Sequence, residues 1–279
     1  MKKILAAFDG LKYSKSTRDY SIFIAKQSGA YLVGVFLDDP TYTSYKIYEL
    51  VTQQGVSESM LEKYESEDKQ HRLGAAKDFK QGCEKEGIEF NIHHDRNIAI
   101  RELKHESIYS DLLVIDSRET LTHYNEKLPT RFIRELLADA QCPVLLVPAR
   151  YKPVSKIILL FDGEPSSVHA IKMFSYMLPR MKDLPAEVVV VKQPGETLHI
   201  PDDRLMKEFM KRHFPKASYT VLKGLAEIEI LSYLKEQKEN LLVILGAYRR
   251  SAVSRWFRQS MADALMKEIK VPLFIAHNK

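Results

Sequence analysis

The sequence has few cysteines and no strong excess of charge of one sign. Cys83 and Cys142 are its only two cysteines, too few for a disulfide framework or a cysteine-ligated metal site. Lysine and arginine total 42 against 37 acidic residues, a formal net charge of +5. Because the basic residues are scattered among acidic ones, charge alone gives little reason to expect a nucleic-acid partner.

Long apolar runs are also missing. The opening MKKILAAF resembles an export signal, but Asp9 and Gly10 interrupt it after five apolar residues, fewer than such a segment needs. No run approaches the roughly 20 apolar residues of a membrane-spanning helix. With 45% hydrophobic and 28% charged residues, we expect a soluble, cytoplasmic globular protein without a membrane partner.

Motifs typical of several enzyme classes are absent. The sequence contains no G-x-x-x-x-G-K-[ST] loop, no G-x-G-x-x-G after its first apolar segment and no G-x-S-x-G elbow. His93, His94 and Asp95 have side chains that bind metals, but neighbouring residues of a strand point to opposite faces and do not converge. We therefore predict no catalytic residues and no metal site.

Short apolar segments alternate with helical patterns in the first part of the chain. Ser14 or Ser16 is expected to cap a helix that ends near Ser28, with Gly29 as its stop. Further helices are expected near 98–109 and 130–140. The predicted strands are residues 3–9, 31–37, 89–94, 111–116 and 142–148. This alternation is typical of a parallel sheet that is covered by helices on both faces.

The pattern then restarts. KIILLFDG at residues 156–163 repeats KILAAFDG at residues 3–10, and Ser166 or Ser167 is expected to open the next helix. The later strands recur at residues 187–191, 216–222, 241–244 and 271–276. A period this long indicates a duplicated domain. We predict an α/β protein with two domains, 1–150 and 151–279, each an open five-stranded parallel sheet.

The first copy carries an insert. The first strands of the two copies start 153 residues apart, whereas the later strands are only about 130 residues apart, so the surplus falls in residues 40–86. The pattern of residues 57–86 predicts a long helix. This helix is expected either to bind a partner protein or to act as a solvated cover for the sheet. Its expected buried stripe is Met60, Leu61, Tyr64, Ala75, Phe79 and Cys83.

The segment from Leu241 to Ser260 is the strongest candidate for a ligand site. It predicts a buried strand, a turn at Gly246, a basic loop and a helix opened by Ser260. In open parallel sheets, ligands bind where strands end and helices begin. Gly246 either admits a ligand or only forms a turn, and Ser260 either binds a ligand or only caps the helix.

Two features together resemble a tandem universal stress protein over essentially the whole chain. One is a strand ending in Asp-Gly before a serine-rich helix start, at Asp9 and at Asp162. The other is the loop from Gly246 to Ser260. The resemblance implies two tandem Rossmann-like domains of the adenine nucleotide alpha hydrolase type. Nucleotide-binding members carry a phosphate loop of the pattern G-x2-G-x9-G-[S/T], in which backbone N–H groups and the hydroxyl hold phosphate.

The resemblance places the binding residues of the second copy at Asp162, Gly246, Arg249, Arg250 and Ser260. Arg249 and Gln259 stand where two of the three loop glycines belong. The resemblance therefore implies at most a weak site for an anion or an adenine nucleotide such as ATP. Each Asp of the Asp-Gly pairs either contacts the adenosine or only shapes its turn.

The first copy departs further from the pattern. Asp116, Glu119 and Pro129 occupy its glycine positions, and Thr130 occupies the hydroxyl position, where it either binds a ligand or only caps the next helix. Two carboxylates would repel a triphosphate, and proline lacks the N–H donor. We expect no nucleotide in this copy.

The resemblance implies a non-enzymatic stress-response or regulatory module. The alternative is an ATP-binding sensor or an ATP-using enzyme that acts at the Gly246–Ser260 loop. Family members commonly pair through their last strands, so VLLV (144–147) and LFIA (273–276) are expected to form an intrachain pseudo-dimer. Further pairing of two chains into a homodimer stays open.

Overall fold

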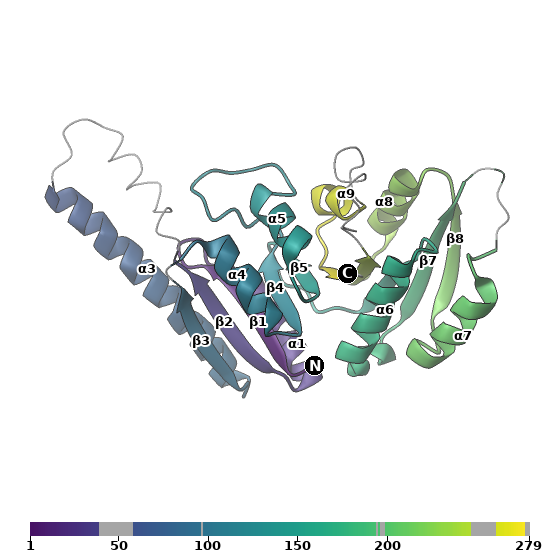
Figure 1. Ribbon diagram of the computed structural model, residues 1–279, viewed down its shortest axis with the longest axis horizontal. Helices are drawn as coiled ribbons and strands as arrows, with labels where there is room; N and C mark the ends of the chain where they lie inside the picture. The colour runs from purple at the N-terminus through teal and green to yellow at the C-terminus, as the bar shows by residue number, and fades with distance from the viewer. Residues whose placement is uncertain (39–57, 96, 194, 196–198, 247–260, 277–279) are drawn as a thin grey trace.

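The core of the protein is one ten-stranded sheet, as the computed structural model shows (Figure 1). The structure describes all residues except 39–57, 96, 194, 196–198, 247–260 and 277–279. The strand order is β3-β2-β1-β4-β5-β10-β9-β6-β7-β8. Neighbouring strands run parallel throughout, except for β5 and β10, which are antiparallel. The predicted α/β class is confirmed, with the two five-stranded sheets joined edge to edge.

The elements from β1 to β5 form what we call the first half. They are β1 (Lys3–Asp9), α1 (Lys15–Ser28), β2 (Tyr31–Leu37), α3 (Glu58–Lys85), β3 (Phe90–Asp95), α4 (Ala99–Ile108), β4 (Leu112–Asp116), α5 (Arg131–Asp139) and β5 (Val144–Val147). The predicted strands of this half are confirmed, with ends displaced by no more than two residues.

The second half repeats this order. Its elements are β6 (Lys156–Leu160), α6 (Pro165–Met177), a 3-10 helix η1 (Pro179–Asp183), β7 (Ala186–Lys192), α7 (Asp203–His213), β8 (Ser218–Lys223), α8 (Ala226–Glu236), β9 (Leu241–Gly246), α9 (Met261–Glu268) and β10 (Leu273–Ala276). The duplication is therefore present in the fold. The domain limits at residues 150 and 151 stay a prediction.

Helices cover both faces of the sheet, as predicted. One buried cluster joins α1, α3, α6 and α7 to strand residues such as Ile4 and Phe8. The other joins α4, α5, α8 and α9 to the intervening residues Leu5 and Ala7. Successive strand residues point to opposite faces, so a strand buried on both sides is apolar at every position.

Local signals decide where several helices begin and end. The Ser14 hydroxyl accepts the N–H of Thr17 at 3.2 Å and caps α1, which stops at Gly29 with φ of +64°. The prediction that Ser166 or Ser167 opens the next helix is wrong, because α6 begins at Pro165. Proline suits a first helical position because its φ is already helical and its missing N–H would have no partner there.

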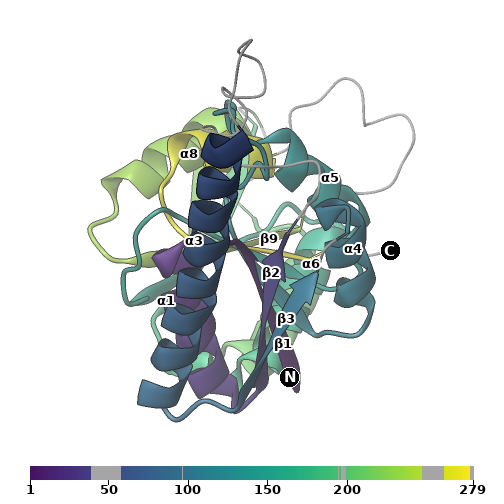
Figure 2. The same ribbon diagram turned by 90° about the vertical axis from the view of Figure 1, so that its left-hand side faces the viewer.

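The long insert helix is α3, and it confirms the prediction for residues 57–86. Its buried residues are Ala75, Ala76, Phe79 and Cys83, whereas Met60 is 45% exposed. The predicted stripe is therefore wrong at its N-terminal end. A helix of 28 residues is about 42 Å long, roughly twice the length of the strands that it covers. Its first turns extend past the sheet (Figures 1 and 2).

The expected contact between the last strands is present. Leu145 of β5 lies opposite Phe274 of β10, with Leu146 opposite Leu273 and Val144 opposite Ile275. This register is symmetric about the Leu145–Phe274 pair. Each apolar edge covers the other, which leaves neither strand open to aggregation.

Truncating Phe274 should destabilise the whole sheet. The side chain is fully buried and its ring lies 5.2 Å from that of Phe174. We expect Phe274→Ala to lower the free energy of unfolding by about 3–5 kcal/mol, measured by denaturant unfolding. The exposed Leu205 provides the control, since Leu205→Ala should cost less than about 0.5 kcal/mol. Equal unfolding midpoints for the two variants would contradict the prediction.

Candidate functional site

A small cavity of about 190 Å³ lies at the carboxyl ends of β6, β7 and β9. In the sheet, β6 lies between β7 and β9. The chain passes from β6 to β7 on one side and reaches β9 on the other side only later. This is the switch point at which open parallel sheets bind ligands. The residues that line it are Leu160, Phe161, Asp162, Ser167, Val189, Val191, Ala226, Ile230, Leu245, Gly246 and Met261.

The cavity is mostly apolar, with one carboxylate at its rim. The Asp162 Oδ1 accepts the backbone N–H of Glu164 at 2.9 Å and the Ser167 hydroxyl at 2.7 Å. Asp162 therefore shapes the turn into α6. Among the described residues, no hydrogen bond to its second oxygen is found. The lining includes no basic residue in the described part of the chain, so these walls suit a ring rather than a phosphate.

Gly246 is explained by a close backbone approach. A Cβ at this position would lie 2.3 Å from the carbonyl carbon of Ser166 and 2.4 Å from its oxygen. The first turn of α6 thus packs directly on the end of β9. Of the two interpretations of Gly246, this contact supports the structural one: a helix, rather than a phosphate, occupies the space that the missing side chain leaves.

The predicted site residues are only partly brought together. Asp162 and Gly246 line the same cavity. Arg249, Arg250 and Ser260 lie outside the described residues, so their roles stay predictions. The sequence argument missed the apolar walls, among them Val189, Val191 and Ile230. The available signal was that these residues lie near strand ends, where open parallel sheets bind ligands. In the sequence, however, an apolar residue that lines a cavity cannot be told from one that fills the core.

Asp116 occupies the position of Gly246 in the first half, as the sequence predicted. Asp116 is the last residue of β4 and lies opposite Val147 of β5, just as Gly246 is the last residue of β9 and lies opposite Ala276 of β10. The Asp116 carboxylate accepts the Ser14 hydroxyl at 2.9 Å and pairs with the Arg118 guanidinium through contacts of 2.9 and 3.0 Å. A side chain fits here because α1 begins six residues after Asp9, whereas α6 begins three residues after Asp162.

Glu119 uses the backbone donors of its own loop. Its Oε1 accepts the N–H groups of Thr120 and Leu121, both at 2.9 Å. Thr130 donates its hydroxyl to the Glu119 carbonyl oxygen and also caps α5, by accepting the N–H of Ile133. The capping interpretation of Thr130 is therefore confirmed. Pro129 lies just before this cap.

Leu121 is buried beneath the same loop. It belongs to the hydrophobic cluster that contains Ala7 and Leu37, the counterparts of Leu160 and Val191 in strand register. In the first half, a buried leucine thus belongs to the same cluster as the strand residues equivalent to Leu160 and Val191.

Burial and the nearby acidic groups bring the pKa of Glu119 close to neutral pH. Burial, followed by the negative charges of Asp9 and Asp116, raises the pKa of Glu119 to about 7, against the opposing effect of its two N–H bonds. Asp9 itself accepts the N–H of Leu11 at 2.8 Å and shapes its turn, as Asp162 does.

Metal-binding side chains do not converge in the described residues. No group of three or more His, Cys, Asp or Glu residues there could hold a metal ion. The His93 Nδ1 instead lies 2.6 Å from the Glu106 Oε1. Cys83 and Cys142 are buried free thiols. In the described part of the chain, no helix combines the length and apolar character that crossing a membrane requires.

Replacing Glu119 by glutamine should change how stability depends on pH. The folded protein holds this proton more tightly than the unfolded chain, whose glutamate has its ordinary pKa of 4.5. The free energy of unfolding therefore falls as pH rises from about 4.5 to about 7. Glu119→Gln keeps an oxygen for both N–H donors and removes this loss. From pH 5 to pH 8, the variant should gain on the order of a few kcal/mol relative to the unchanged chain. Parallel pH profiles in denaturant unfolding would refute this.

Adding one methyl group at Gly246 should be destabilising. Because backbone atoms of Ser166 cannot move aside cheaply, we expect Gly246→Ala to cost about 1–3 kcal/mol in denaturant unfolding. At Gly74 in α3, nothing lies within 4 Å of the position that an added methyl group would take, so Gly74→Ala should be neutral or stabilise by up to about 1 kcal/mol. A Gly246→Ala protein as stable as Gly74→Ala would show that the contact with α6 is unimportant.

By sequence, the chain matches no family model and no curated protein. Its fold resembles that of a universal stress protein from Archaeoglobus fulgidus DSM 4304, with a TM-score of 0.73 and 14% identity over 99% of this chain and 98% of that chain. A putative universal stress protein from Pseudomonas aeruginosa UCBPP-PA14 has a TM-score of 0.58 and 13% identity, over 99% and 93% of the two chains. A functionally unknown protein from Pseudomonas aeruginosa PAO1 has a TM-score of 0.58 and 12% identity, over 99% and 92%. Over essentially its whole length, the chain therefore has the fold of the universal stress proteins, which confirms the predicted resemblance at the level of the fold.

Proposed function

We propose that the chain is a non-enzymatic stress-response or regulatory module that takes one small ligand, in its second half. The likeness of its fold to the universal stress protein from Archaeoglobus fulgidus supports the class. The observation that carries the proposal is the difference between the halves. The second half keeps an apolar cavity with Asp162 at its rim, whereas the first half presents Glu119 and Leu121 at the equivalent strand ends.

An adenine nucleoside or nucleotide suits this cavity in part. Val189, Val191 and Ile230 provide apolar walls for a planar ring, and the second oxygen of Asp162 is placed to accept a hydrogen bond from a ligand hydroxyl or amine. Binding pockets for whole drug-sized ligands typically measure about 300–1,000 Å³. A cavity of 190 Å³ holds a ring but not a complete nucleotide, so any phosphates lie outside it.

Phosphate contacts would then have to come from the loop that follows β9. Arg249, Arg250 and Ser260 are the residues proposed for this role, and they lie outside the described residues. Gly246 itself leaves no space for a phosphate, because the start of α6 packs against it. We therefore propose weak binding of adenine nucleotides such as ATP, dominated by the ring.

The first half is proposed to bind no nucleotide. Asp116 and the buried Glu119 bring carboxylates to the strand end, and the Asp116 charge at about 4 Å from a phosphate charge would cost roughly 1–4 kcal/mol, depending on exposure. The Glu119 carboxylate also occupies two backbone N–H donors that an anion would need. Leu121 adds apolar bulk at the counterpart of the cavity.

Two partner surfaces belong to this proposal. The pairing of β5 with β10 makes the chain its own pseudo-dimer, so a second chain is not needed to cover those edges. The part of α3 that extends past the sheet is proposed as a protein-binding surface. An ATP-binding sensor or ATP-using enzyme at the Gly246–Ser260 loop remains the alternative function, and turnover of ATP would favour it.

Isothermal titration of the full chain with adenosine and ATP tests the site. Ile230 is 7% exposed and lines the cavity, whereas Ile228, on the same helix, is 59% exposed. Ile230→Trp should fill the cavity and weaken binding at least about tenfold, equivalent to about 1.4 kcal/mol, while Ile228→Trp should bind as the unchanged chain does.

Three results would count against the proposal. They are binding that survives Ile230→Trp, binding lost equally in both variants, and the absence of any adenine-ligand binding by the unchanged chain. Hydrolysis of ATP that is abolished by Ser260→Ala would favour the enzymatic alternative instead.

A further inference from the structure

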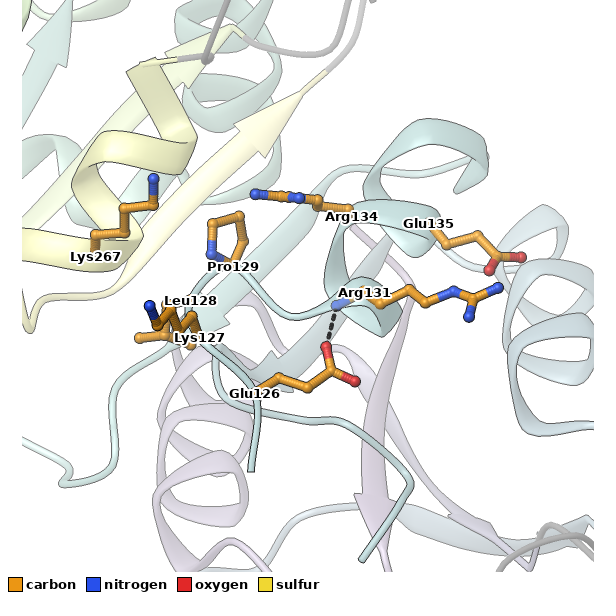
Figure 3. Close-up of a pocket in the computed structure, with 8 residues that line it drawn as sticks. All are labelled: Glu126, Lys127, Leu128, Pro129, Arg131, Arg134, Glu135 and Lys267. Atoms are coloured by element: carbon orange, nitrogen blue, oxygen red, sulfur yellow. Dashed lines mark hydrogen bonds between the residues drawn. The ribbon is translucent and has the colours of Figure 1, made fainter. Parts of the chain in front are cut away.

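A second and larger cleft, of about 750 Å³, lies at the seam between the two halves (Figure 3). We call it the seam cleft. Four of its lining residues are basic: Lys127, Arg131 and Arg134 come from the first half, and Lys267 comes from α9 of the second half. Glu126 and Glu135 are its two acidic residues, so the lining carries a net charge of +2.

Both acidic residues have partners of their own. The Glu126 carboxylate accepts the backbone N–H of Arg131 at 2.6 Å, at the first turn of α5. Glu135 accepts a hydrogen bond from Lys104 at 2.8 Å. The Glu135 charge is therefore paired with a lysine outside the lining, whereas Glu126 keeps its negative charge in the cleft.

The basic side chains have few partners. Arg134 has one long contact, at 3.8 Å, with Asp263 of α9. Within the described residues, Lys127 and Lys267 form no ion pair. In Figure 3 the Arg134 guanidinium extends toward Lys267, with Pro129 between them, whereas Arg131 extends away toward Glu135. Positive charge from both halves thus faces one open space.

We propose that the seam cleft binds a small inorganic polyphosphate anion, held by Lys127, Arg134 and Lys267. Arginine offers several N–H donors to phosphate oxygens, and the lysines add point charges. Within the described residues, the apolar part of the lining is Leu128 and Pro129, and no aromatic side chain lines the cleft. Recognition therefore rests on charge, without a surface on which a base would stack.

The cleft combines residues of both halves, and its two sides differ. Arg134 and Asp263 occupy equivalent positions, each ten residues before the equivalent strand residues Val144 and Leu273. A symmetric pair of identical copies would bring like residues together there. The counterpart of Lys267 by the same spacing is Ala138, so this lysine belongs to one side of the seam only. Bound anion would link α5 to α9 and stabilise the contact between the halves.

Titration of the full chain with sodium tripolyphosphate at low ionic strength tests the proposal. Arg134 and Lys267 are exposed, so Arg134→Gln/Lys267→Gln should fold normally, which circular dichroism checks. We expect binding at least about tenfold weaker in this variant, because two charge-assisted contacts are lost. The matched control is Lys80→Gln/Lys207→Gln, which removes the same charge from exposed sites on α3 and α7 and should change affinity less than about twofold.

Raising the salt should weaken binding by the unchanged chain, since exposed charges are screened. Equal weakening in the two double variants would show diffuse attraction to net charge and would overturn the proposal. No binding by the unchanged chain would do the same. Ile230→Trp distinguishes the seam cleft from the cavity at β6, because it should leave the affinity for tripolyphosphate unchanged. If Ile230→Trp abolished tripolyphosphate binding, the anion would bind in the cavity at β6, and the seam-cleft proposal would be refuted.

Discussion

The antiparallel pairing of β5 with β10 is the interaction on which the rest of the structure depends. Both strands are short, apolar and fully buried, and each would otherwise present unpaired backbone donors and acceptors at a sheet edge. Because they pair, the two buried clusters each run through both halves. The same pairing brings α5 beside α9, places Arg134 near Asp263 and creates the seam cleft.

The two halves show how one scaffold accommodates different strand ends. In the second half, α6 begins early and lies on the end of β9, so only glycine fits at position 246. In the first half, α1 begins later, and the space is taken by Asp116 with its partners Ser14 and Arg118. A shift of about one helical turn in where the helix begins therefore decides whether the last residue of the neighbouring strand can carry a side chain.

Electrostatics distinguish the strand ends of the first half from the seam. Buried carboxylates gather at the strand ends of the first half, where burial and mutual repulsion favour the protonated form of Glu119. Basic side chains instead gather at the seam, at the surface, where solvent limits the cost of holding like charges together. We therefore expect anions to be disfavoured at the first location and favoured at the second.

The sequence by itself determined the α/β class, the duplication, the helix stop at Gly29 and the extent of α3, because each depends on residues close together in the chain or on a repeated pattern. It limited the first helix cap to Ser14 or Ser16 and offered Thr130 as either a cap or a ligand contact. The phosphate-loop pattern of the family that the sequence resembles also matched Asp116 to Gly246. Only the tertiary structure decided why Gly246 is glycine, which end of α3 is buried, and that Lys267 faces Arg134. Those outcomes depend on strand register and on where a helix lies over the sheet, so segments far apart in the chain set them together.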